Sequence, residues 1–255
     1  MGHLCSFCGN RADSREHVWP RWLARIIEQL PGEKKLLFNI RTDKHGHRKK
    51  WQSPKPEIVT KKICKTCNEG WMSDLEKDAS SILRPMIYRD GQTLTGKQQE
   101  TIALWIVKTA MVLDSISAEV SFYEMSERTH FYKSFFPPGT VNFYLGFCSG
   151  TYWSGFTEFR ILLDPQRPPR SRSYILTMSF GGLVLQFCNT KAMAEVVEYR
   201  NVKGEWSTVE LVPPFPDPIR WPPADPAFDD SEKTILAFAE RFGGIQGLAG
   251  FRSTT

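Results

Sequence analysis

Two Cys-x-x-Cys pairs near the start of the chain hold the residue type that most often binds structural zinc. The first pair is Cys5 and Cys8, and the second is Cys64 and Cys67. Four thiolates are enough to complete a tetrahedral zinc site, so the sequence predicts one structural Zn²⁺. His3 lies close to the first pair, but two complete cysteine pairs already fill the site. We therefore expect no ligand role for His3.

A carboxylate, an imidazole and a carboxamide stand beside these pairs. Glu16 and His17 lie between the pairs, and Asn68 follows the last cysteine directly. Carboxylate and amide oxygens suit a hard cation such as Mg²⁺ or Mn²⁺, and a neutral imidazole can take a proton from water. These groups are the parts of a one-metal phosphodiesterase. His17 is open to a second interpretation as a zinc contact or a packing residue. Glu76 is either a further ligand or a solvent-facing helix charge.

Short elements must position these groups. Residues 15–19 are typical of a brief strand or turn before Pro20, and apolar spacing predicts a helix from Arg21 to Leu30. Strands are expected at 36–40 and 57–60, around a polar turn at 42–50. A second helix is expected from Asn68 to about Ser80, with Trp71, Met72, Leu75 and Ala79 on its apolar face.

The remainder of the chain predicts helices beside an antiparallel sheet. Cys148 and Cys188 fall in predicted strands and are expected to be buried apolar residues rather than ligands. A proline-rich stretch at 212–225 is expected to run extended. The fold class is therefore α+β. The expected helices span residues 97–117, 126–135 and 231–242, and the expected strands span 141–148, 157–163, 174–178 and 183–188.

Positive charge is concentrated in the segment that carries the cysteine pairs. Residues 1–78 contain 16 of the 33 Lys and Arg residues but only 10 of the 28 Asp and Glu residues. Such an excess is either a solvated surface or the footprint of a polyanion, and its coincidence with the motifs favours nucleic acid. The basic residues expected to contact phosphates are Lys34, Lys35, Arg41, Lys44, Arg48, Lys49, Lys50, Lys61 and Lys62.

The ordered pattern Cys-x-x-Cys, Glu-His-x-x-Pro, Cys-x-x-Cys-Asn resembles the HNH, or ββα-metal, endonucleases. The resemblance implies that His17 is the general base, that Glu16 and Asn68 bind a catalytic Mg²⁺ or Mn²⁺, and that the four cysteines bind structural zinc. It covers about a third of the chain. Two features depart from the pattern: many members have Asp where this chain has Glu16, and 51 positions separate His17 from Asn68, which requires an insertion in the hairpin.

The resemblance implies a metal-dependent endonuclease acting on DNA, with restriction or phage defence as a role known for the family. We expect an HNH-like nuclease domain at 1–83 and an α+β domain at 84–255 that selects targets, dimerises or contacts a partner protein. The alternatives are a nucleic-acid-binding zinc module that does not cut and an RNA-directed nuclease. No apolar run approaches the ~20 residues that cross a bilayer, and cysteine usage favours a reducing compartment, so we expect a cytoplasmic protein without membrane contact.

Overall fold

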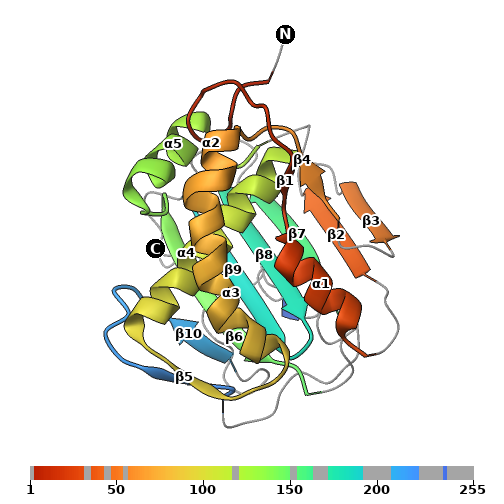
Figure 1. Cartoon of the computed structure of the whole chain (residues 1–255), viewed down its shortest axis with the longest axis vertical. Coiled ribbons are helices and arrows are strands. Elements are labelled where there is room, and N and C mark those ends of the chain that lie inside the picture. The colour runs from red at the N-terminus through yellow and green to blue at the C-terminus, as the bar shows by residue number, and fades with distance from the viewer. Residues whose placement is uncertain are drawn as a thin grey trace, which may run out of the picture.

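The chain folds into a mixed α+β structure in which helices α1, α3 and α4 lie against one face of a β-sheet (Figure 1). The computed structural model describes residues 3–31, 36–42, 47–53, 57–116, 121–149, 154–162, 172–191, 208–223 and 238–239. For residues 36–42, 47–53, 157, 159–162 and 172 it describes the backbone only.

The large sheet has seven strands in the order β10-β6-β9-β8-β7-β2-β3. All neighbouring strands are antiparallel except β2 and β7, which are parallel. The four strands predicted between residues 141 and 188 are confirmed as β6 to β9. The strands of this sheet are β2 (Leu36–Thr42), β3 (His47–Ser53), β6 (Thr140–Phe147), β7 (Ser154–Leu162), β8 (Arg172–Phe180), β9 (Leu183–Thr190) and β10 (Thr208–Leu211).

Two short antiparallel pairs lie outside the large sheet. The first joins β1 (Glu16–His17) to β4 (Val59–Thr60), and the second joins β5 (Gln92–Leu94) to β11 (Ile219–Trp221). Trp19 follows β1 closely and packs edge-on against Phe156 and Phe180 of the large sheet, with ring centroids 5.8 and 5.0 Å away. This contact fixes the chain after β1 against the sheet.

The helices agree in position with the sequence predictions and differ mainly at their ends. The helix expected from Asn68 to about Ser80 begins earlier, includes a π-helical turn and continues to Ile87. The last predicted helix, at 231–242, lies outside the described residues except for 238–239. The helices are α1 (Arg21–Gln29), α2 (Lys65–Cys67), the π-helical turn η2 (Asn68–Met72), α3 (Ser73–Ile87), α4 (Gly96–Ile116) and α5 (Met125–Ser134).

Helix α4 is the most deeply buried helix of the described fold. Fifteen of its 21 residues are buried, including every residue from Trp105 to Ser115. It packs along α3, receives the hydroxyl of Tyr174 from β8 on the Ala110 carbonyl, and contacts Trp22 of α1 through Trp105. A helix buried on all sides needs partners for any charge that it carries, because an unpaired buried charge is costly.

The pairing of the strands bears on several of the sequence expectations. The prediction of a polar turn over residues 42–50 extends too far, because strand β3 already begins at His47. Strands β2 and β3 come from the predicted nuclease domain but extend the sheet of the second predicted domain, and residue 83 lies inside α3.

Cys148 and Cys188 are both fully buried, as expected. Of the described helices, none is long and apolar enough to cross a membrane.

Candidate metal centre and the residues around it

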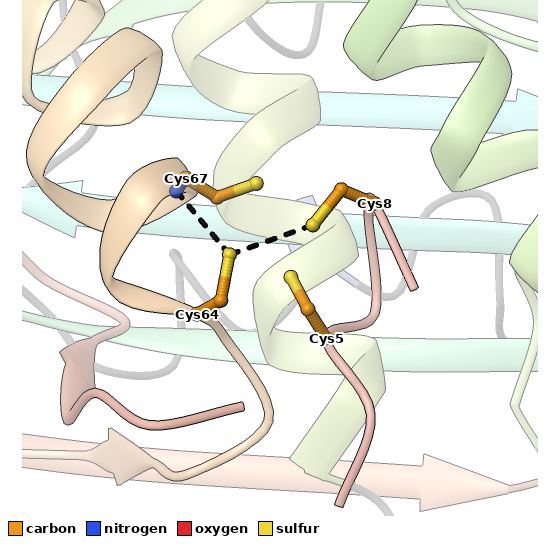
Figure 2. A group of neighbouring side chains, drawn as sticks. All are labelled: Cys5, Cys8, Cys64 and Cys67. Carbon is orange, nitrogen blue, oxygen red and sulfur yellow. Dashed lines mark hydrogen bonds between the residues drawn. The ribbon is translucent and has the colours of Figure 1, made fainter. Parts of the chain in front are cut away.

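The four predicted zinc cysteines converge on one point (Figure 2). The sulfur atoms of Cys5, Cys8, Cys64 and Cys67 all lie within 4.8 Å of one another. Cys8 Sγ and Cys64 Sγ are 3.4 Å apart, and the Cys67 backbone N–H donates to Cys64 Sγ at 3.4 Å. In the described part of the chain, no other group of three or more His, Cys, Asp or Glu side chains is placed to bind a metal ion.

Two tight backbone loops present these sulfur atoms. In the first, Gly9 N donates to the Cys5 carbonyl at 3.0 Å, and Gly9 adopts a φ of +76°, which glycine reaches without steric cost. In the second, Cys64 precedes the short helix α2, which carries Cys67 back towards it. The Ser6 N–H donates to the Lys62 carbonyl at 2.9 Å and joins the two loops. Residues 56 positions apart are thereby brought into one cluster.

The electrostatics of the cluster favour a bound cation. A hydrogen bond from the Cys67 thiol lowers the pKa of Cys5, and the same contact, with burial, raises the pKa of Cys67. Burial also raises the pKa of Cys64. One thiolate therefore forms readily, whereas further thiolates repel one another unless a cation replaces their protons.

The donor set and its size fit zinc. Four thiolates are the usual ligands of a structural Zn²⁺, and a Zn–S distance of about 2.3 Å places tetrahedral sulfur atoms about 3.8 Å apart. The observed limit of 4.8 Å needs only a small contraction. His3 is exposed and is not part of the cluster.

The Glu-His motif occupies β1, which pairs with β4 over two residue pairs, Glu16 with Thr60 and His17 with Val59. Glu16 and Thr60 are both buried, whereas His17 and Val59 are half-buried. Neighbouring side chains of a strand point to opposite faces, so Glu16 lies on the inner face of this pair and His17 on the outer face. Among the described residues, His17 forms no side-chain hydrogen bond or ion pair.

The Glu16 carboxylate lies against Lys108 of α4. Lys108 Nζ is 2.8 Å from Glu16 Oε1 and also contacts Glu76 Oε1 of α3. The side chains of Lys108, Glu16 and Glu76 are 0%, 5% and 19% exposed. The structure thus brings together the predicted ligand Glu16 and the candidate Glu76, with an ammonium group between them.

Charge balance holds this triad together. Burial opposes the ammonium charge, but the carboxylates of Glu16 and Glu76 outweigh it and raise the pKa of Lys108. Burial raises the pKa of Glu76 above its usual value, against the lowering effect of Lys108. Removing one partner of such a buried pair costs about 3–5 kcal/mol, because the remaining charge is left uncompensated.

Asn68 lies at the start of η2, where the helix departs from α-helical geometry. Its side-chain Nδ2 donates to Ser14 Oγ at 3.1 Å, and Ser14 Oγ donates to the Ile63 carbonyl at 2.9 Å. Ser14 is two residues before Glu16, so Asn68 is linked to the segment that leads into β1. Short π-helical turns are frequent at functional sites.

The structure describes the predicted phosphate-binding residues unevenly. Lys61 is exposed, whereas Lys62 is half-buried and its ammonium donates to the Ser115 carbonyl at 2.5 Å, near the end of α4. Arg41 is opposite Arg48 in the β2–β3 register. Lys49 and Lys50 lie in β3, for which only the backbone is described, and Lys34, Lys35 and Lys44 lie outside the described residues.

Sequence reasoning missed Lys108. The available signal was a single charge in the run Ala103–Leu113, which is otherwise apolar except for Thr109. A lysine in a fully buried helix requires acidic partners from other elements. The sequence alone does not show that these are Glu16 and Glu76.

Comparison with known proteins adds no relative: no family model matches the chain, and no curated protein or solved structure shows significant similarity to it.

Proposed function

We propose that the chain is a metal-dependent endonuclease that hydrolyses DNA phosphodiester bonds, as its HNH-like motif implies. The observation that carries the proposal is the order of elements around the cysteine cluster. Strand β1 bears Glu16 and His17, β4 pairs with it, and the helical segment that follows begins at Lys65 and bears Asn68. The cysteines join both ends of this unit, which supports the two-strands-and-helix arrangement expected of the family.

His17 is the group proposed to take a proton from the attacking water. Its place on the outer face of β1 leaves it half-buried rather than enclosed. A neutral imidazole nitrogen can accept a proton from water, and a positioned general base contributes about 10²–10⁴-fold to a hydrolysis rate.

Glu16 and Asn68 are the residues proposed to hold the catalytic cation. When bound, such a cation neutralises a non-bridging phosphate oxygen and stabilises the leaving 3′-oxygen. Asn68 fits this role in that its amide nitrogen is fixed by Ser14, while its Oδ1 accepts no hydrogen bond from the described residues. The fit of Glu16 is less direct, because one of its oxygens is already bound by Lys108.

Nucleic acid is the proposed substrate because the basic excess of residues 1–78 coincides with the motif. The exposed cations near this unit include Arg11, Arg15, Lys61 and Lys65. Cations at the surface neutralise the phosphate backbone without reading base sequence.

A second candidate function is a nucleic-acid-binding zinc module that does not cut. The observation in its favour is the burial of Glu16 against Lys108, which gives this carboxylate a structural role that needs no metal. Under this alternative the cysteine cluster and the basic surface remain functional, and the Glu-His motif does not.

Cleavage assays separate the two candidates. Zinc-loaded protein is incubated with Mg²⁺ or Mn²⁺ and with duplex, single-stranded or branched DNA, and with RNA. His17→Ala is expected to lower the cutting rate by about 10²–10⁴-fold while keeping zinc and DNA binding, because it removes only proton abstraction. Asn68→Ala is expected to be partly rescued by high Mn²⁺, since it weakens the hold on the cation.

The matched control is His130→Ala, which removes an exposed imidazole from α5. It is expected to cut at the wild-type rate. Normal cutting by His17→Ala would exclude this active site. A wild-type protein that cuts no substrate with any divalent cation would favour the binding module, and cutting of RNA alone would change the substrate.

A further inference from the structure

The buried triad of Glu16, Lys108 and Glu76 joins three elements that carry or support the proposed site. Glu16 comes from β1, Glu76 from α3 and Lys108 from α4. The two carboxylates are 60 positions apart in the chain, and both contact the same ammonium group. A salt bridge of this kind is weak grounds for stability, because apolar side chains in the same space are often as stabilising. The triad matters more for the way in which it orients β1, α3 and α4 relative to one another.

The strand pairing of β1 with β4 contributes only a few backbone contacts to the orientation of β1. The β1–β4 ladder is only two residue pairs long. A slip of one residue in a strand exchanges its inner and outer faces. Outside the ladder, the Val18 N–H donates to the Ile58 carbonyl at 2.8 Å and the Ser14 N–H to the Ile63 carbonyl at 3.2 Å, and these bonds oppose such a slip. A slip or rotation here would move Glu16 outward and His17 inward.

Lys108 adds a constraint that acts directly on the Glu16 side chain. Val107 and Thr109 on either side of it are fully buried, so its backbone belongs to the rigid centre of α4. The ammonium group has no exposed surface and contacts Glu16 Oε1 at 2.8 Å, so Glu16 can leave only by abandoning a buried charge. As long as Glu16 faces Lys108, strand alternation turns His17 to the outer face.

We infer that Lys108 is a positioning residue for the proposed nuclease: through Glu16 it fixes the face of β1 and so presents His17 to substrate. The expected effect on DNA cleavage rests on the proposed function, whereas the expected effect on the orientation of His17 does not. Without Lys108, a buried Glu16 carboxylate has no paired cation, so its free energy is lower when it turns to water. His17 then turns inward.

The test compares Lys108→Met with Arg128→Met in the full-length, zinc-loaded protein. Arg128 of α5 forms another buried ion pair with α4, to Asp114 at 2.5 Å, and this pair includes no residue of β1. Lys108→Met leaves the carboxylates of Glu16 and Glu76 without their cation, and Arg128→Met does the same to Asp114, so both are expected to destabilise the fold. Only Lys108→Met is expected to change the orientation of His17.

Two measurements report on His17. The first is its rate of modification by diethyl pyrocarbonate, read by peptide mass spectrometry with exposed His130 as the internal reference. The second is steady-state DNA cleavage. Lys108→Met is expected to slow modification of His17 several-fold and to lower kcat by about 100-fold, the contribution of a general base, with KM little changed. Arg128→Met is expected to leave both at the wild-type values.

Lys108→Arg and Lys108→Gln keep the test decisive if the methionine variant does not fold, which loss of bound zinc would reveal. Arginine retains the charge and is expected to restore most of the His17 modification rate, whereas glutamine is not. Modification of His17 at the wild-type rate in a folded Lys108→Met or Lys108→Gln protein would overturn the inference. A wild-type protein without nuclease activity would refute the proposed function, while the modification rates would still decide whether Lys108 orients His17.

Discussion

Replacing Cys64 with serine should release zinc and unfold the unit that contains the proposed site. Cys64 is buried, lies 3.4 Å from Cys8 through their sulfur atoms, and accepts the Cys67 backbone N–H. Serine leaves three thiolates and a hydroxyl that binds Zn²⁺ poorly at neutral pH. Because the cluster ties residues 5–8 to residues 64–67, its loss also frees the segment that leads into β1.

The expected size of the effect follows from the number of ligands. Structural zinc in small cysteine sites contributes about 10–16 kcal/mol of apparent binding free energy at pH 7, so an equal quarter share per ligand is about 2.5–4 kcal/mol. This share is a lower bound, because a site with three good ligands binds the metal far less tightly. Complete loss would approach or exceed the ~5–15 kcal/mol that stabilises a typical domain.

The assay measures zinc per chain by elemental analysis and stability by urea unfolding. Wild type is expected to carry about one zinc and Cys64→Ser much less, with a lower unfolding midpoint. Cys188→Ser is the matched control: Cys188 is fully buried in β9 but outside the cluster. It should keep its zinc and be destabilised only by the ~1–3 kcal/mol of a buried hydroxyl. A Cys64→Ser protein with full zinc occupancy and a wild-type midpoint would refute the assignment of the cluster.

Neutralising Arg48, Lys49 and Lys50 should weaken DNA binding and reduce the log–log salt slope by about 0.9 for each phosphate that the protein no longer neutralises. A control variant that lacks the exposed cations Arg84, Lys97 and Lys133 is expected to keep the wild-type slope. If the variant at residues 48–50 also kept that slope, the binding surface would lie elsewhere. Glu76→Gln should change how stability depends on pH. Burial raises the pKa of Glu76 in the folded state, so the folded protein holds this proton more tightly than the unfolded chain. Wild-type stability should therefore fall relative to Glu76→Gln as the pH rises through this pKa, and urea unfolding that shows the opposite slope would contradict the raised value. The raised pKa of Lys108 has the same sign: its contribution to stability should persist below the usual lysine value of 10.5 and disappear only above it, as unfolding of wild type and Lys108→Met at alkaline pH would show.

Local patterns predicted those parts of the fold that are decided within a few residues. Alternating apolar residues located strands β6 to β9 within three residues at each end, and a helical period located α4 within one residue. The two Cys-x-x-Cys pairs predicted that the four cysteines lie in one cluster, because a shared metal ion constrains ligands far apart in the chain. Each of these signals is contained in the residues that form the feature.

Contacts between distant segments were not predictable in the same way. Parallel pairing of β2 with β7 joins residues 36–42 to residues 154–162, and nothing in either segment specifies the other. Burial of α4 on all sides results from its position between α3 and the sheet, whereas its sequence predicted one apolar face. The partners of Lys108 depend on both arrangements, so they emerge only when β1, α3 and α4 are placed together.

The Glu-His motif shows why residue type and spacing leave a role undecided. From the sequence, Glu16 is a carboxylate beside a histidine and is expected to bind a cation. In the structure the cation beside it is Lys108, which is supplied by the chain itself. A carboxylate has two oxygens, so a bond to Lys108 through Oε1 is compatible with metal binding through the other oxygen, and also with a purely structural role. The consequence for His17 is the same in both cases, because fixing Glu16 inward sets the histidine outward. The orientation of His17 is therefore the property of this motif that the structure determines most directly, and it depends on a lysine 91 positions further along the chain.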